Sequence, residues 1–475
     1  MDNQETLFDE LEKEYRIRTP QSLVLHQRAG TSMIKGGSHN LRLWRPYPFF
    51  TAGASGAEVE DVDGRVYVDY WQGHYANVLG HDPTAVREAV AACGSGRAAL
   101  HSGFEGESQV RLAEIILGAL GYTDFKIRFT TSGTLAAMYA VMLGLAHTGR
   151  DRVLKIGGGW HGASPLLLKG VKFHPGLGYE AADSAGVPAD FMDRIDIVPF
   201  NDGERLDRII REKGDRIGCF ILEPVLGAGG FLPASPEYLR LARRLTAERG
   251  IVLIFDEIVS GFRFAPAPVQ TLYGVKPDLT TLGKVVGGGH AVAAVAGRAD
   301  ILDDCDNKVP ESRRVLFEGG TFSAHPLYMR SGAAMLEHLR TNAAAIYPRL
   351  AAAGDRLRRG IASAFQAERI EVLMTGGGNE VIPGSSLFMV HFPRTAFTPT
   401  KAEDLADPAK ADIVLREDTL KLFLCLRNVH IVHGGGAASF AHTDTQIETT
   451  IAAYAEAARV FKKRLFTTGS SKYVT

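Results

Sequence analysis

Short apolar runs alternate with helical patterns between about residues 81 and 345, and this alternation most constrains the fold. The runs that predict strands cover residues 124–130, 152–156, 218–224, 251–257 and 278–284. Helical patterns at 134–149 and 235–250 lie between them. Strands separated by helices predict βαβ units and a largely parallel sheet, which binds ligands at the carboxyl ends of its strands.

The two ends of the chain carry different patterns. Apolar residues recur at helical spacing between residues 7 and 15, and Asp63-Gly64 separates two alternating apolar runs, which predicts a hairpin. Helical patterns at 347–370 and 443–466 flank an irregular polar stretch. These patterns predict a smaller α+β domain after about residue 346.

Composition excludes several function classes. The 475 residues include 53 basic and 54 acidic side chains, so we expect no nucleic-acid partner. There is no apolar leader and no purely apolar run of about 18 residues, so we expect no membrane contact and a cytoplasmic location. The four cysteines, Cys93, Cys219, Cys305 and Cys425, lie far apart, which favours a reducing compartment and predicts no metal site.

Ser132, Gly133 and Thr134 form a small polar turn between a predicted strand and a predicted helix. The first N–H groups of a helix have no partner within it and lie at its positive end, so they bind phosphate well. The same residue types also make an ordinary helix cap that needs no ligand. The turn is therefore either a phosphate site or only a cap.

A glycine-rich segment at 157–162 matches the G-x-G-x-x-G pattern of dinucleotide-binding proteins. That interpretation needs an acidic residue at the end of a second strand about 20 positions later. Asp183 has nearly that spacing, but it falls in a stretch typical of a loop. Trp160 can instead present a flat ring to a planar cofactor, or it is simply a buried aromatic residue.

The near-continuous apolar strand at 251–257 places Asp256 at its carboxyl end. A buried carboxylate is costly unless it meets a positive group, and a protonated heterocyclic nitrogen is such a partner. Glu257 follows directly, but strand alternation turns it to the opposite face, so the two residues do not form a carboxylate pair.

Lys284 stands at the end of the strand predicted at 278–284, and a triple glycine follows shortly after it. Lysine is almost never fully buried unless it is paired or covalently engaged. A desolvated amine reacts with aldehydes, so Schiff-base chemistry accounts for a lysine in this place. A lysine that reaches the surface along its apolar stem is the alternative.

Taken together, these groups match the needs of pyridoxal 5'-phosphate (PLP). This cofactor carries a phosphate, a planar pyridine ring and an aldehyde, and it acts as an electron sink when a lysine imine forms and an acid keeps the ring nitrogen protonated.

The chain resembles the class III aminotransferases of the fold-type-I PLP enzymes, closest to the glutamate-1-semialdehyde aminomutase-like branch, from about residue 30 to 460. The resemblance rests on motifs in the family's order: GGSHNLR (36–42), VDGRVYVDYWQGHYANVLGH (62–81), TTSGT (130–134), WHG (160–162), LEPV (222–225), IFDEIVSGFR (254–263), LGKVVGGG (282–289), GGTFSAHP (319–326) and FAHTD (440–444).

This resemblance implies an α/β fold with a mostly parallel seven-stranded sheet between helices, plus a smaller α+β domain from both chain ends. We accordingly expect an N-terminal segment over 1–80 that belongs to the small domain, a large PLP-binding domain over 81–345, and a C-terminal small domain over 346–475. It also implies a homodimer with active sites at the subunit interface.

The resemblance further implies a role for each matching residue. Lys284 forms the Schiff base and moves the proton, Asp256 pairs with the pyridinium nitrogen, and Trp160 and Ile258 pack on the two ring faces. The phosphate is held by Ser132, Gly133 and Thr134, and Thr321 reaches the phosphate bound in the neighbouring subunit. Glu223 supports the residues that contact the cofactor, and Arg42 binds the substrate carboxylate.

Some positions depart from the family pattern. GTFSAHP contains His325 where the family has asparagine in GTFSGNP, and HGGGAASFAHTD has no arginine where many ω-amino-acid members carry one. These altered pocket positions, with extra length around 173–190 and 394–412, favour a transaminase that moves an amino group from an amino acid or amine to a keto acid or aldehyde.

Three other functions remain open. An intramolecular aminomutase shares all the catalytic residues with a transaminase, so the residues do not separate the two. A non-catalytic relative used as a binding module and a nicotinamide oxidoreductase are the remaining alternatives.

Overall fold

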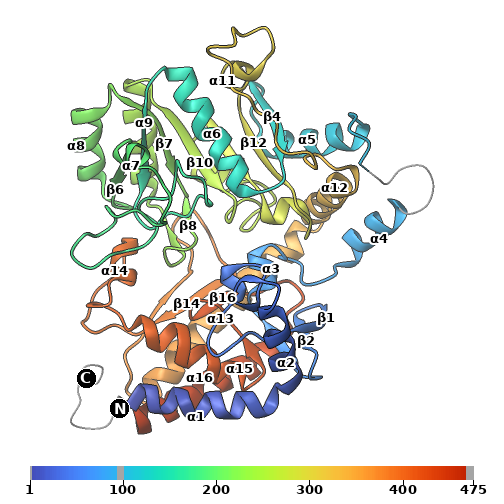
Figure 1. Ribbon diagram of the computed structural model, residues 1–475, viewed down its shortest axis with the longest axis vertical. Coiled ribbons are helices and arrows are strands. Elements are labelled where there is room, and N and C mark those ends of the chain that lie inside the picture. The colour runs from blue at the N-terminus through green and yellow to red at the C-terminus, as the bar shows by residue number, and fades with distance from the viewer. Residues whose placement is uncertain (1–2, 94–100, 467–475) are drawn as a thin grey trace.

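The computed structural model describes residues 3–93 and 101–466, which form two lobes (Figure 1). One lobe holds a seven-stranded sheet, and the other holds both ends of the chain, blue and red in Figure 1. No helix within the described ranges is long and apolar enough to cross a membrane. The same ranges contain no cluster of three or more His, Cys, Asp or Glu residues arranged to hold a metal ion.

The seven-stranded sheet is parallel except for one strand. In spatial order its strands are β4 (Phe125–Thr130), β12 (Ala293–Arg298), β11 (Leu279–Leu282), β10 (Val252–Glu257), β7 (Ile217–Leu222), β5 (Arg152–Ile156) and β6 (Ile195–Val198). Only β12 runs antiparallel to its neighbours. The expected mostly parallel sheet is thus confirmed, and β7 and β10 are buried along their whole length, as strands covered on both faces must be.

All five strands expected from the sequence occur within two residues of their predicted limits, whereas β6 and β12 were not predicted. One prediction is wrong in detail, because Lys284 does not end a strand. β11 stops at Leu282, and Lys284 begins the 3₁₀ helix η3 (Lys284–Gly287) with a φ of 48°. A residue in the left-handed region cannot continue an extended strand.

Helices cover the sheet and complete its core. α6 (Gly133–Thr148) packs across the centre, against β7, β10, β11 and β12. α8 (Gly203–Lys213) and α9 (Pro236–Glu248) pack near β6 and β10, α5 (Glu107–Leu120) packs on β4, and α12 (Pro326–Thr341) packs on α5 and α4 (Thr84–Cys93). Ser132 caps the start of α6, and Gly149 ends it with a φ of 66°, a conformation that suits glycine.

The second lobe joins the two ends of the chain. Its helices are α1 (Asn3–Arg18), α2 (Pro20–Gly30), α13 (Ala343–Ala367) and α16 (Asp444–Arg464). One sheet has the order β1 (Thr51–Ser55), β2 (Glu58–Asp61), β3 (Val66–Asp69) and β15 (Val429–His430), and another has β13 (Leu373–Thr375), β14 (Leu387–His391) and β16 (Gly435–Ala437).

The pairing of β15 with β3 brings residue 429 beside residue 68, so both ends share one sheet. The hairpin expected around Asp63-Gly64 is confirmed as the antiparallel pair β2 and β3. The domain boundaries near residues 80 and 345 stay a prediction, and residues 1–2, 94–100 and 467–475 of the predicted domains lie outside the described residues.

Shorter elements connect these parts. They are η1 (Ile34–Gly36), η2 (Asn40–Arg42), α3 (Gln72–Tyr75), α7 (Ala189–Asp193), β8 (Val225–Leu226), β9 (Leu232–Pro233), α10 (Gln270–Tyr273), α11 (Ala299–Leu302), η4 (Asp303–Cys305), α14 (Ala402–Ala406), the π-helix η5 (Leu415–Leu420) and α15 (Lys421–Cys425).

Candidate active site

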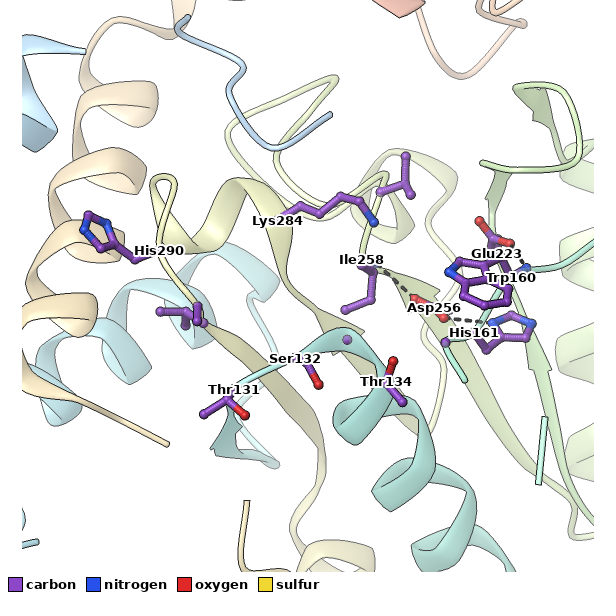
Figure 2. A pocket seen from close by; sticks show the side chains of 15 residues that line it. Thr131, Ser132, Thr134, Trp160, His161, Glu223, Asp256, Ile258, Lys284 and His290 are labelled. Carbon is purple, nitrogen blue, oxygen red and sulfur yellow. Dashed lines mark hydrogen bonds and ion pairs between the residues drawn. The ribbon is translucent and has the colours of Figure 1, made fainter. Parts of the chain in front are cut away.

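A cavity of about 270 Å³ opens at the carboxyl ends of β7 and β10, beside the start of α6 (Figure 2). A parallel sheet places such a cavity there because its strand ends and helix starts meet at one edge. Eight of the ten residues predicted from the sequence line it: Ser132, Gly133, Thr134, Trp160, Glu223, Asp256, Ile258 and Lys284. Thr131, His161, Val259 and His290 also line it and were not predicted.

The start of α6 forms the floor of the cavity. The Ser132 hydroxyl caps the helix by accepting the N–H of Leu135 at 3.3 Å, and the Thr134 hydroxyl accepts the N–H of Ala163 at 3.4 Å. Gly162 lies against Thr134 with a φ of 81°, so no Cβ intervenes there. A helix start with exposed polar groups and a small neighbouring loop is suited to an anion such as phosphate.

Asp256 accepts three hydrogen bonds at the end of β10. Its Oδ1 accepts the N–H of Ile258 at 3.1 Å and the hydroxyl of Thr281 at 2.9 Å, and its Oδ2 accepts Nδ1–H of His161 at 2.8 Å. The parallel register places Thr281 of β11 directly beside Asp256. These donors fix the orientation of a carboxylate that is 3% exposed.

His161 is the main residue that the sequence reasoning missed. Its ring is buried, and burial lowers its pKa although the hydrogen bond to Asp256 opposes this shift. A neutral ring with Nδ1–H facing Asp256 has its Nε2 as an acceptor, and that atom has no hydrogen-bond partner among the described residues. The WHG motif contained this residue, but only the fold places it behind Asp256.

Glu223 lies directly after β7 and supports the same loop. Its Oε1 accepts the N–H of Trp160 at 2.9 Å, and its Oε2 accepts the N–H of Gly227 at 2.8 Å. Burial and the nearby Asp256 raise the pKa of Glu223 to about 8. Glu223 is therefore largely protonated at neutral pH.

Lys284 reaches into the cavity towards the side where Asp256, His161 and Trp160 lie (Figure 2). Burial lowers the pKa of its amine, while Asp256 and Glu223 oppose the shift. Its left-handed backbone, with a φ of 48°, is a strained conformation for lysine, and such strain is concentrated at functional sites. The site thus combines an amine, a carboxylate and an anion-binding helix start.

Trp160 and Ile258 provide apolar surfaces at the cavity. Trp160 is 40% exposed and Ile258 lies close to Gly133 at the start of α6. Large side chains left open at a polar cavity can cover the faces of a planar ligand.

Thr321 and Arg42 do not line this cavity. Thr321 is exposed, and its expected contact with a second subunit stays a prediction. Arg42 lines a separate cavity of about 600 Å³. It donates a hydrogen bond to Ser38 at 3.0 Å, and within the described ranges it has no carboxylate partner.

The turn α3 (Gln72–Tyr75) has a left-handed backbone throughout, which the sequence did not reveal. The φ values of Gln72, His74 and Tyr75 are 46°, 60° and 68°. Such residues cost about 1–2 kcal/mol each, so hydrogen bonds must hold the turn in place. Asp69 supplies some of them, because its carboxylate accepts the N–H groups of Trp71 and Gln72 at 2.9 and 2.8 Å.

His74 connects this turn with the cavity electrostatically. Burial, together with the charges of His39, Arg42 and Lys284, lowers the pKa of His74 to about 4. α3 packs against η3, the helix that Lys284 begins. His74 is therefore neutral at physiological pH and lies near the amine.

The dinucleotide interpretation of residues 157–162 finds no support in this geometry. Asp183 does not line the cavity, and its carboxylate instead accepts the N–H groups of Val171 and Lys172 at 2.9 and 2.7 Å. It holds its own loop together.

Comparison with known proteins identifies relatives across most of the chain. The family model described as aminotransferase class-III matches residues 43–375. A glutamate-1-semialdehyde 2,1-aminomutase of Methanothermobacter thermautotrophicus is 36% identical over 396 residues, which cover 83% of this chain and 88% of that protein. Other relatives with the same name are 32–36% identical.

Solved structures extend the similarity to the whole fold. A β-phenylalanine aminotransferase from Variovorax paradoxus has a TM-score of 0.83 and 26% identity, with 97% of this chain and 98% of that chain covered. A transaminase with PLP bound has a TM-score of 0.81 and 28% identity, with 94% of this chain and 99% of that chain covered.

Proposed function

Because the chain belongs to the class-III aminotransferase family of PLP-dependent enzymes, we propose that it moves an amino group on a small carboxylate-bearing substrate and that Lys284 carries the chemistry. One observation carries the proposal: the Lys284 amine, the Asp256 carboxylate and the start of α6 all open into a single cavity.

The residues of the cavity fit PLP. Ser132, Gly133 and Thr134 offer the start of a helix to a phosphate, and Asp256 offers a fixed carboxylate to a ring nitrogen. Trp160 lies beside them with an exposed ring. When bound, PLP supplies an electron sink that makes the C–H bond next to the substrate's amino group acidic.

Lys284 acts as the nucleophile and then as the carrier of a proton. Burial lowers the pKa of its amine, which increases the neutral fraction able to attack a carbonyl carbon. When the same amine is no longer bonded to a carbonyl carbon, it still lies within the cavity. There it accepts a proton from the substrate carbon and returns it to another atom.

Asp256, His161 and Glu223 set the charge behind the reacting groups. His161 and Thr281 donate hydrogen bonds to Asp256 and keep its carboxylate oxygens oriented. Glu223 holds the backbone of Trp160 in place and, with its raised pKa, adds little negative charge at neutral pH.

For the reaction itself we propose intramolecular exchange, which moves the amino group between neighbouring carbons of one substrate. The relatives named glutamate-1-semialdehyde 2,1-aminomutase support this choice. They favour it over the intermolecular transamination that the altered pocket positions and the extra loop length predict. Arg42 carries a positive charge without a carboxylate partner among the described residues, and we propose that it binds the substrate carboxylate.

Intermolecular transamination is the second candidate. The two solved structures at 26% and 28% identity support it, since both are named as transaminases. We also propose a homodimer in which Thr321 contacts the cofactor phosphate of the other subunit. Thr321 is exposed and does not line the cavity of its own subunit, which is compatible with that role. Sedimentation at low protein concentration measures whether the protein is a dimer.

Spectroscopy of the purified protein with added PLP tests the proposed chemistry. We expect a visible band that is absent from Lys284→Ala. Borohydride reduction and peptide mapping should place the cofactor on Lys284 and not on Lys155, a second buried lysine, which donates to the carbonyls of Gly159 and Leu167. Absence of a band in the wild-type protein would contradict the proposal.

Product analysis then separates the two reactions. With glutamate-1-semialdehyde as the only substrate, intramolecular exchange yields the isomer with its amino group on carbon 1 and needs no second carbonyl compound. A requirement for an added keto acid or aldehyde, with a free keto product, would instead establish transamination.

A further inference from the structure

Arg263 occupies an unusual environment for an arginine. Its side chain is 2% exposed, yet within the described ranges its hydrogen bonds go to backbone carbonyls and it forms no ion pair with a carboxylate. Its Nε donates to the carbonyl of Val259 at 2.9 Å, and its Nη2 donates to the carbonyl of Tyr75. Arginine is rarely buried without an ion pair, because burial of an unpaired charge is costly.

The two carbonyls belong to parts of the chain that meet at the active site. Val259 follows β10 and lines the cavity, whereas Tyr75 ends the left-handed turn α3. α3 packs against η3, which begins at Lys284. Arg263 therefore ties the strained turn to the loop beside the reactive amine.

The charges around Lys284 come from several elements. Asp256 at the end of β10 favours its protonated form, as does Glu223 after β7 when that carboxyl is ionised, and Arg263 opposes both. His74 on α3 also lies near the amine, but it is neutral because its pKa is lowered to about 4. Burial is the main cause of the lowered pKa of the amine, and Arg263 adds a permanent positive charge that also acts against its protonation.

We propose that Arg263 is a positioning residue for Lys284: its unpaired guanidinium holds the turn α3 against the site and, as a fixed positive charge, keeps the amine available as a nucleophile. This inference rests on the proposed function, since it assigns a purpose to a neutral Lys284. It does not require that Arg263 touch substrate or cofactor.

The experiment measures how the reactivity of the Lys284 amine depends on pH in the cofactor-free protein. Trace labelling with acetic anhydride at a series of pH values, followed by mass spectrometry, gives the pH midpoint of Lys284 reactivity. Arg263→Met removes both the charge and the hydrogen bonds. Arg263→Gln removes the charge but keeps an N–H donor for a carbonyl.

We expect the midpoint to rise by about one pH unit in both variants, because loss of a nearby positive charge stabilises the ammonium form. Below the midpoint this corresponds to a roughly tenfold smaller neutral fraction. If Arg263 served only as a clamp, the Gln variant would recover the wild-type midpoint, and that result would overturn the charge role.

Arg358→Met is the matched control. Arg358 also donates to backbone carbonyls, those of Gly376 and Ser385 among them, but it lies on α13 in the second lobe. We expect a loss of stability without a change in the Lys284 midpoint. An unchanged midpoint in both Arg263 variants, each shown to be folded by a cooperative thermal transition, would refute the inference.

The labelling result is independent of cofactor binding. Failure of the wild-type protein to form a visible band with PLP would remove the proposed function, whereas the midpoint shift would still report whether Arg263 controls the amine. A normal band with no shift would leave the proposed function in place and remove only the role of Arg263.

Discussion

Gly162→Ala tests whether the close approach between the loop at residues 157–162 and the start of α6 builds the anion site. Gly162 has a φ of 81°, and an added Cβ would lie 2.5 Å from Cα and 2.8 Å from Cβ of Thr134. These separations are far below van der Waals contact, and the atoms belong to a helix start that cannot simply rotate away. Either the loop or the first turn of α6 must move.

The expected cost has two parts. An alanine in the left-handed region costs about 1 kcal/mol, and forced overpacking adds about 1–3 kcal/mol, so we expect a loss of about 2–4 kcal/mol in the free energy of unfolding. Gly149→Ala is the matched control. Gly149 has a φ of 66° but no atom within 4 Å of the added Cβ, so only the backbone cost of about 1 kcal/mol applies.

Two assays separate stability from binding. Denaturant unfolding of the cofactor-free proteins measures the free energies, and absorbance titration compares the affinity for PLP with that for pyridoxal, which lacks the phosphate. We expect Gly162→Ala to weaken PLP binding at least tenfold, or about 1.4 kcal/mol, with a smaller effect on pyridoxal. Equal losses of affinity for both ligands would refute the assignment of the phosphate to this site. Equal destabilisation in the two alanine variants would refute the close approach between Gly162 and Thr134.

Three further predictions concern buried polar groups. Thr281→Val should destabilise the protein by about 1–3 kcal/mol in denaturant unfolding, because it removes one donor to Asp256; no measurable change would exclude that contribution. Burial and Asp256 raise the pKa of Glu223 to about 8, so the folded state retains a proton that the unfolded state has lost, and stability falls as pH rises from about 4.5 to about 8. Glu223→Gln should flatten the unfolding free energy over that range, and an unaltered slope would contradict the shifted pKa. Burial of Asp69 alone would raise its pKa, but hydrogen bonds from His430 and a second histidine outweigh this and lower it, so its stabilisation is present above pH 4 and lost as pH falls. Asp69→Asn should cost about 3–5 kcal/mol at pH 7 and lessen the acid sensitivity of thermal unfolding, and equal melting temperatures at pH 7 would refute this.

Strong local patterns in the sequence predicted much of the fold. The continuous apolar runs at 152–156 and 251–257 predicted strands within a residue of the observed limits, and Asp63-Gly64 predicted the hairpin. β6 and β12 escaped prediction because β6 is short and β12 is rich in alanine and glycine, which have weak strand preference. Their places in the sheet depend on neighbouring strands.

The site residues that the sequence predicted are of types that are seldom found in such places without a chemical role. A carboxylate and a lysine at the edge of a buried sheet, and a polar turn before a helix, each point to chemistry, and eight of the ten predicted residues line the cavity. His161 escaped because a histidine next to a tryptophan is compatible with many environments. Its role depends on Asp256, which is 95 positions away in the chain.

Periodicity, caps and motifs act over a few residues, so the amino-acid sequence was sufficient to predict the main elements, the family and most of the candidate residues that line the cavity. The packing of the whole chain was needed to see that Lys284 starts a 3₁₀ helix, that Glu223 is protonated beside Asp256, and that Arg263 holds a left-handed turn. Burial, pKa and strain depend on which distant segments pack together, and no local pattern records those distances.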